Sequence, residues 1–144
     1  MALEAARLRS DTFSLDPTPE GDKVYDLPLG DDLAAVLRER MLALAPHLWI
    51  DDPIREDWGT VLWVKVEREQ YYINVQWLPD KSVENRWGIT FTERRGFWSS
   101  LLGHRRQSVP PGLLQELVAQ VLNADPSTFR EVEWMSYDEW EERI

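Results

Sequence analysis

Three alternating runs between residues 60 and 92 constrain the fold of this chain more than any other feature. In the second and third runs every other residue is apolar or aromatic: Tyr71, Ile73, Val75 and Trp77, then Trp87, Ile89 and Phe91. The residues between them are polar or small, which is typical of half-buried antiparallel strands. The connections at 67–70 and 79–85 are too short for a crossover helix. The sequence therefore predicts a three-stranded meander.

Amphipathic patterns on both sides of the meander predict helices. Residues 33–44 place apolar side chains three and four positions apart, after a capping segment at 30–32. Residues 111–123 repeat this pattern, and Ser136 with Glu139 forms a capping box that starts a last helix. Residues 129–134 alternate and predict a fourth strand.

The first thirty residues carry weaker signals. We expect a helical turn or two at 2–8, a loop at 16–21, and a short edge strand at 23–27 that Pro28 ends. The predicted fold class is thus α+β: a two-layer sandwich of a three- to four-stranded antiparallel meander, with an extra N-terminal edge strand, on two main helices and a short C-terminal helix. We predict one domain, residues 1–144, with residues 1–22 partly flexible.

Charge and composition exclude several classes of protein. The net charge of −10 argues against a nucleic-acid binder, which needs a basic face, and favours attraction to a basic protein. The chain has no cysteine, and neither its first residues nor any later stretch has an apolar run of signal-peptide or membrane-span length. We expect a cytoplasmic protein without a membrane span.

The motifs of common catalytic and cofactor sites are absent from the sequence. His47 and His104 have no neighbour at metal-ligand spacing, and there is no glycine-rich phosphate loop or serine elbow. The carboxylates of Asp51, Asp52, Glu56 and Asp57 lack the spacing of a calcium loop. We therefore predict no metal, no cofactor and no enzymatic activity, and interpret these acids as a solvated loop.

Tryptophan is unusually frequent, with eight residues. Trp63, Trp77 and Trp87 lie in predicted strands and are assigned to the core, whereas the others lie in loops or beside acidic runs, where we expect one or two exposed anchors. The predicted partner-binding set comprises Trp49, Asp51, Asp52, Glu56, Asp57, Trp58, Trp134, Asp138, Glu139 and Trp140. A basic loop forms a second candidate set, which comprises Arg94, Arg95, Trp98, Arg105 and Arg106.

The basic loop supports three further expectations. Phe97 with Leu101, and Trp98 with Leu102, are spaced for a short helix. The loop is either a packing element or an interaction site for a partner or an anionic surface. Its arginines are also expected to pair with the acidic C-terminal segment, 131–142, and so to orient the tail.

These observations favour a small acidic protein that masks a basic protein partner, as an immunity protein or antitoxin does. Two alternatives stay open. The order of helix, three strands and helix loosely resembles the dimeric chaperones of type III secretion effectors, and such a chaperone would be a homodimer with apolar grooves. The other is an enzyme whose site is assembled from scattered carboxylates.

Overall fold

An antiparallel meander forms the centre of the computed structural model, which describes residues 3–16, 19–20, 23–24, 27–66, 69–79, 82–83, 85–94 and 112–143. Its strands are β6 (Thr60–Val66), β7 (Glu69–Trp77) and β8 (Arg86–Arg94). The register pairs Ile73 with Phe91 and Val75 with Ile89, so the alternating apolar residues share one face. These residues are buried, and the predicted meander is confirmed.

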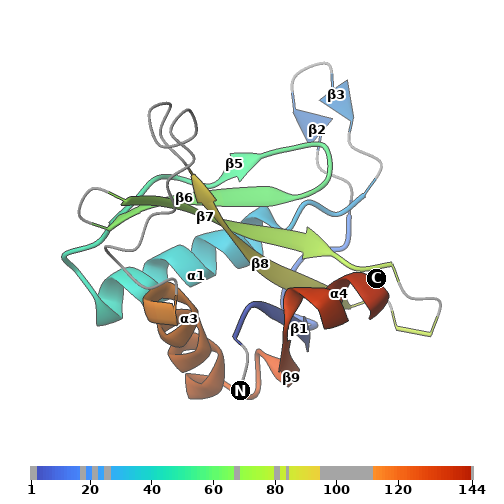
Figure 1. Cartoon of the computed structure of the whole chain (residues 1–144). Helices are drawn as coiled ribbons and strands as arrows, with labels where there is room; N and C mark the ends of the chain where they lie inside the picture. Colours follow the sequence, from blue (N-terminus) through green and yellow to red (C-terminus); the bar gives the residue numbers. More distant parts are fainter. Residues whose placement is uncertain are drawn as a thin grey trace.

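Four further strands extend the meander into a seven-stranded sheet (Figure 1). On one side lie β1 (Ala5–Arg9) and β9 (Arg130–Met135), which is the predicted fourth strand. On the other side β4 (Trp49–Ile50) and β5 (Ile54–Arg55) both pair with β6. The order is β4-β6-β7-β8-β1-β9, and every pairing is antiparallel.

The prediction of a helical turn at residues 2–8 is wrong, because this segment contains β1. Ala6 and Leu8 point into the core while Arg7 and Arg9 lie on the outer face, where both make ion pairs. Hydrogen bonding to β8 and β9 on both sides overrides the local preference for helix. Of the edge strand predicted at 23–27, the structure describes β3 (Lys23–Val24), which pairs with β2 (Pro19–Glu20) outside the main sheet, while residues 25 and 26 lie outside the described residues.

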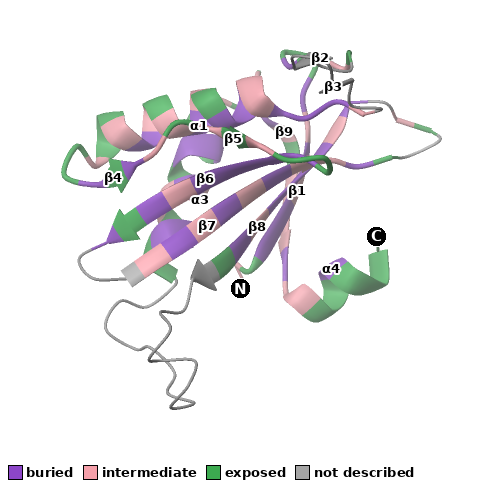
Figure 2. Cartoon of the chain, turned by 90° about the horizontal axis from the view of Figure 1, so that it is seen from above, coloured by how far each residue is buried: buried purple, intermediate pink, exposed green. Residues whose placement is uncertain are grey.

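Two helices cover one face of the sheet, α1 (Asp31–Leu44) and α3 (Gly112–Ala124), and they pack side by side (Figure 1). Both predicted helices and the two-layer α+β fold are confirmed. The helix side chains that enter the core are Leu33, Ala34, Leu37, Met41, Leu114, Val118, Val121 and Leu122. Figure 2 shows how buried residues follow the strands beneath these helices. No helix in the described segments is long and apolar enough to cross a membrane.

Asp125 ties the end of α3 to α1. Its carboxylate accepts hydrogen bonds from the Thr128 backbone at 3.3 Å, the Ser127 hydroxyl at 2.8 Å and the Arg40 guanidinium at 2.9 Å. Bonds from Thr128, Ser127 and Arg40 hold the pKa of Asp125 well below its usual value. The connection after α3 is therefore fixed by a half-buried carboxylate that receives three hydrogen bonds.

The short helix α4 (Tyr137–Arg143) lies on the opposite face of the sheet, as its one buried residue shows. The Trp140 ring occupies a recess over Gly88, on the side of β8 that faces away from α1 and α3. Together with Ala5, Leu78 and Met135 it forms a second, smaller apolar cluster. The Ser136 hydroxyl accepts a hydrogen bond from the Glu139 backbone at 3.3 Å, which is half of the predicted capping box.

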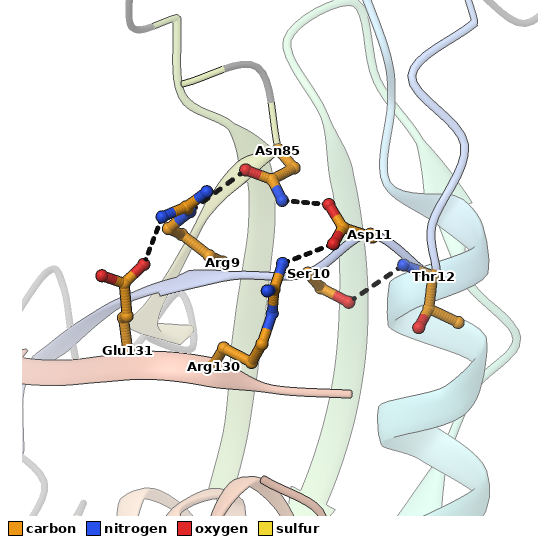
Figure 3. A network of polar contacts seen from close by, with 7 residues as sticks. All are labelled: Arg9, Ser10, Asp11, Thr12, Asn85, Arg130 and Glu131. Carbon is orange, nitrogen blue, oxygen red and sulfur yellow. Dashed lines mark hydrogen bonds and ion pairs between the residues drawn. The ribbon is translucent and has the colours of Figure 1, made fainter. Parts of the chain in front are cut away.

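A network of polar contacts fixes the outer edge of the sheet at β9 (Figure 3). Arg9 pairs with Glu131 at 2.8 Å, and Arg130 pairs with Asp11. Asn85 connects the two pairs, since its amide accepts from Arg9 and donates to Asp11. Glu131 has a φ of 51°, and the β1–β9 register shifts at this point. The network therefore holds an irregular edge strand in place.

Candidate functional site

The acidic edge segment, residues 49–58, runs along the exposed edge of β6. Ile50 pairs with Val64 and Ile54 with Val61, so three residues of the segment lie opposite two of β6. Pro53 has no N–H to donate, whereas the backbone N–H of Asp51 still reaches the Trp63 carbonyl at 3.0 Å. The segment is a strand broken at its centre by a bulge.

Three apolar side chains of this segment are exposed to solvent. Trp49 is 43% exposed, Ile54 40% and Trp58 39%. The Trp49 ring meets Trp63 edge-on at 5.6 Å, and the Lys65 ammonium lies 4.5 Å from the Trp49 centroid. Trp49 is therefore held in one orientation with part of its surface uncovered.

The tip of the segment is set by a tight turn. Glu56 and Gly59 exchange backbone hydrogen bonds of 2.8 and 3.4 Å, which leaves Asp57 and Trp58 at the exposed tip. A Cβ at Gly59 would lie 2.3 Å from the Val75 carbonyl oxygen, so only glycine allows this approach to β7. Close packing on the sheet thus determines where Trp58 is presented.

Two arginines anchor the segment from α1 and β5. Arg38 Nε donates to the carbonyls of Ile50 and Asp51, at 3.0 and 3.1 Å. Arg55 forms an ion pair with Asp31 at 2.9 Å. The Asp52 carboxylate is 3.9 Å from Arg38 and its side chain is 89% exposed, so most of its charge faces solvent.

Glu56 and Asp57 are exposed and have no ion pair within the described part of the chain. Together with Asp52 they give the segment a negative field next to its uncovered tryptophans. Within the described residues no group of three His, Cys, Asp or Glu side chains is placed to hold a metal ion.

The two tryptophans in the C-terminal half of the predicted partner-binding set are covered, unlike Trp49 and Trp58. Trp140 is only 7% exposed, and Trp134 is half-buried with its ring stacked on Phe91 at 6.3 Å. The Trp140 ring can cover the sheet because Gly88 beneath it has no side chain, whereas the Trp134 ring packs on Phe91. Asp138 and Glu139 are exposed, but the tryptophan next to them in the sequence, Trp140, is buried.

The acidic C-terminal segment forms ion pairs with arginines of β1 and α4, which were not predicted as its partners. Glu133 pairs with Arg7 at 2.8 Å and with Arg143, and Glu131 pairs with Arg9. Bonds from Arg143 and then Arg7 lower the pKa of Glu133.

The predicted pairing of the tail with the basic loop falls largely outside the described residues, as do Arg95, Trp98, Arg105, Arg106 and the short helix expected there. Arg94 ends β8, and its side chain also lies outside the described residues.

Sequence reasoning missed Ile54, Trp63 and Lys65 as parts of the exposed surface. Trp63 was assigned to the core, but it lies on the outer face opposite Tyr72 and is half-buried. The sequence signal for this outer position is the alternation in β6, which puts Trp63 on the same face as Lys65. Leu62 and Val64, on the opposite face, are both fully buried. Trp87 is fully buried as predicted, and Trp77 is partly buried against the core.

Comparison of the chain with protein-family models, with curated proteins and with solved structures finds no match.

Proposed function

We propose that this chain is a non-catalytic acidic protein that binds a basic protein partner through the acidic edge segment, as an immunity protein or antitoxin masks its target. One observation carries the proposal. Three of the five large hydrophobic side chains that are exposed in the described residues lie within residues 49–58, interleaved with four carboxylates.

The two kinds of side chain have separate roles in this proposal. Tryptophans are enriched among interface residues that dominate affinity, because they bury a large apolar area and have one N–H to pair. Carboxylates at the rim act mainly on the association rate, by attracting a basic surface over a distance that salt shortens. The net charge of −10 acts in the same direction.

The segment is also ordered before any partner arrives, which supports the proposal. Arg38 holds its backbone, the Glu56–Gly59 turn fixes its tip, and Trp49 is clamped between Trp63 and Lys65. Fixing side chains on association costs about 0.5–1.5 kcal/mol for each rotamer-rich group. A pre-ordered surface avoids most of this cost.

The test compares two variants of equal charge change in affinity capture from cell lysate. The edge variant carries Asp51→Asn, Asp52→Asn, Glu56→Gln and Asp57→Asn. The control variant carries the same number of amide substitutions on α4, at Asp138, Glu139, Glu141 and Glu142. We expect a basic protein to be captured by the wild type and the control, to be lost from the edge variant, and to be released by salt.

A third variant, Trp49→Ala with Trp58→Ala, separates anchoring from attraction. With the captured protein purified, we expect the dissociation rate to rise in this variant and the association rate to fall in the amide variant. Equal capture by the edge variant and the control would contradict the proposal.

A second candidate function, a homodimeric chaperone, is favoured by one observation. Leu44 and Leu113 are 54% and 48% exposed, and Leu113 lines a small apolar depression of about 120 Å³ that also contacts Leu48 and Leu117. Such a groove suits an apolar segment of a client protein. Light scattering tests this candidate, because a monomeric protein at all concentrations would exclude it.

A further inference from the structure

A second concave site lies apart from the acidic edge segment, where the N-terminal segment, β7, β8, α3 and α4 meet. This pocket has a volume of about 510 Å³, within the range of small-molecule sites. Its walls include the aromatic rings of Tyr71, Phe91 and Tyr137. It shares no residue with the acidic edge segment, so it needs an account of its own.

Hydrogen bonds hold the wall of this pocket in place. The pairing of β8 with β1 stops at Thr90, so the next residue, Phe91, has no partner in β1. The Phe91 backbone N–H instead donates to the Tyr137 hydroxyl at 2.9 Å, and that hydroxyl donates to the Phe91 carbonyl. The Tyr137 backbone N–H in turn donates to the Glu4 carboxylate at 3.1 Å. The Tyr137 side chain thus replaces the missing strand partner of β8, and the Tyr137 backbone N–H fixes one carboxylate of the pocket.

The charged groups among the described lining residues of the pocket are negative. Glu4 and Glu116 are carboxylates, and the described lining residues include no lysine or arginine. The N-terminal end of α3 at Gly112 has the opposite polarity, but a helix dipole is equivalent to only about half an elementary charge. Two full negative charges outweigh it, so the described part of the lining favours a cation.

Gln115 supplies an unpaired hydrogen-bond acceptor. Its side chain lines the pocket, the residue is only 7% exposed, and the amide oxygen is enclosed without a hydrogen-bond partner in the described structure. A buried acceptor without a donor destabilises the free protein. The terminal torsion of glutamine is broad, so a modest rotation turns this oxygen towards a donor inside the pocket.

We propose that this pocket binds a small organic cation, an arylalkylamine, whose ammonium group donates to Gln115 and lies near Glu4 and Glu116. Rings and carboxylates together suit such a ligand, since aromatic faces attract an ammonium group and cover the apolar body that carries it. The inference is independent of the proposed function, because it concerns other residues and another class of ligand.

The test uses three probes of nearly equal shape and different charge. 2-Phenylethylamine is the cation, 2-phenylethanol its neutral counterpart, and phenylacetate its anionic counterpart. Binding to the whole chain is measured by chemical-shift titration and by calorimetry. We expect the amine to bind at least about tenfold more tightly than the alcohol, as one charged hydrogen bond implies, and the anion to bind most weakly.

Three variants connect this binding to the pocket. Gln115→Leu removes the acceptor and should weaken amine binding about tenfold while raising thermal stability, because an unpaired buried group is lost. Gly112→Leu adds a side chain at a pocket-lining position where a Cβ meets nothing within 4 Å, so it should block binding without unfolding the protein. Gln120→Leu, on an exposed position of the same helix, is the control and should bind the amine normally.

Equal binding of the amine and the alcohol would overturn the proposal, as would the absence of amine binding to the wild type. Undiminished binding by both Gln115→Leu and Gly112→Leu would place the amine elsewhere and would also overturn it. Binding that is lost in Gly112→Leu and kept in Gln120→Leu supports it even where Gln115→Leu proves unstable.

Discussion

Replacement of Gly88 by alanine should separate α4 from the sheet. A Cβ at this position would lie 2.2 Å from Cη2 of Trp140, and 3.1 and 3.2 Å from Cζ2 and Cζ3. Non-bonded carbon atoms rest about 3.5–4.0 Å apart. The difference between the 2.2 Å contact and this resting separation shows that the indole must move by more than about 1 Å.

The expected cost lies between two limits. If the ring only shifts within its recess, the change resembles overpacking, which costs about 1–3 kcal/mol. If the ring is expelled, the loss approaches that of truncating a buried tryptophan, about 3–5 kcal/mol. Because the apolar cluster that holds Trp140 is small among the described residues, with Ala5, Leu78 and Met135, we expect about 2–4 kcal/mol.

Urea unfolding followed by circular dichroism measures this cost, and a double-mutant cycle assigns it. Trp140→Ala removes the ring that the new methyl group would meet. In that background Gly88→Ala should be neutral or slightly stabilising, because alanine has less backbone freedom to lose than glycine. A red shift of tryptophan emission in Gly88→Ala would report the exposed indole directly.

Two results would refute this reasoning. One is a loss of less than about 0.5 kcal/mol in Gly88→Ala, which is within the range of an ordinary surface substitution. The other is an equal loss in the wild-type and Trp140→Ala backgrounds, which would show that the strain arises elsewhere.

Three further predictions concern the sheet and its charges. Gly59→Ala should cost more than about 3 kcal/mol in urea unfolding, because the added Cβ would lie 2.3 Å from the rigid Val75 carbonyl. Glu133→Gln should cost about 0.5–1 kcal/mol at neutral pH, because the variant cannot form the ion pairs with Arg7 and Arg143. Folding lowers the pKa of Glu133, so the stability difference between the variant and the wild type should vanish as the pH falls below 4.5 and through the folded pKa. Tyr137→Phe should cost about 1–3 kcal/mol, because it removes the partner of the Phe91 N–H and carbonyl. Burial raises the pKa of Tyr137, so the stability that its neutral hydroxyl provides should be lost above pH 10.

Matched controls accompany these predictions. Gly112→Ala adds a Cβ that would meet nothing within 4 Å and should be neutral or stabilising, in contrast to Gly59→Ala. Glu141→Gln changes an exposed carboxylate and should alter the free energy of unfolding at neutral pH by less than about 0.5 kcal/mol. A Glu133→Gln variant whose stability deficit grows on acidification would contradict the sign of the argument.

Periodicity was sufficient to predict the elements that pack by their own pattern. The meander, α1 and α3 follow from alternation or from three- and four-residue spacing, because each buries one continuous face. Strand β9 and helix α4 follow from weaker signals, a short alternating run and a capping box. Strand β1 could not be predicted in this way. Its residues Ala5 to Arg9 favour a helix locally, and only pairing with both β8 and β9 makes them a strand.

The candidate site was predictable in part, for a similar reason. Tryptophans beside carboxylates indicated the acidic edge segment, and Trp49 and Trp58 are exposed there. The same pattern at Trp140 was misleading, because the ring contacts a glycine that is 52 positions away in sequence. The Gln115 pocket had no sequence signal, since its lining comes from five separate segments.

The irregular backbone at Glu131 has a consequence for how the molecule behaves in a crowded solution. A regular, straight outermost strand offers a template on which further chains assemble, and this is a common route to fibrils. Here the terminal strand is kinked and carries charges on neighbouring residues, while the opposite margin is broken by Pro53. Both flanks of the sheet therefore discourage growth by strand addition, and the molecule can expose tryptophan on one margin without the usual risk of polymerisation.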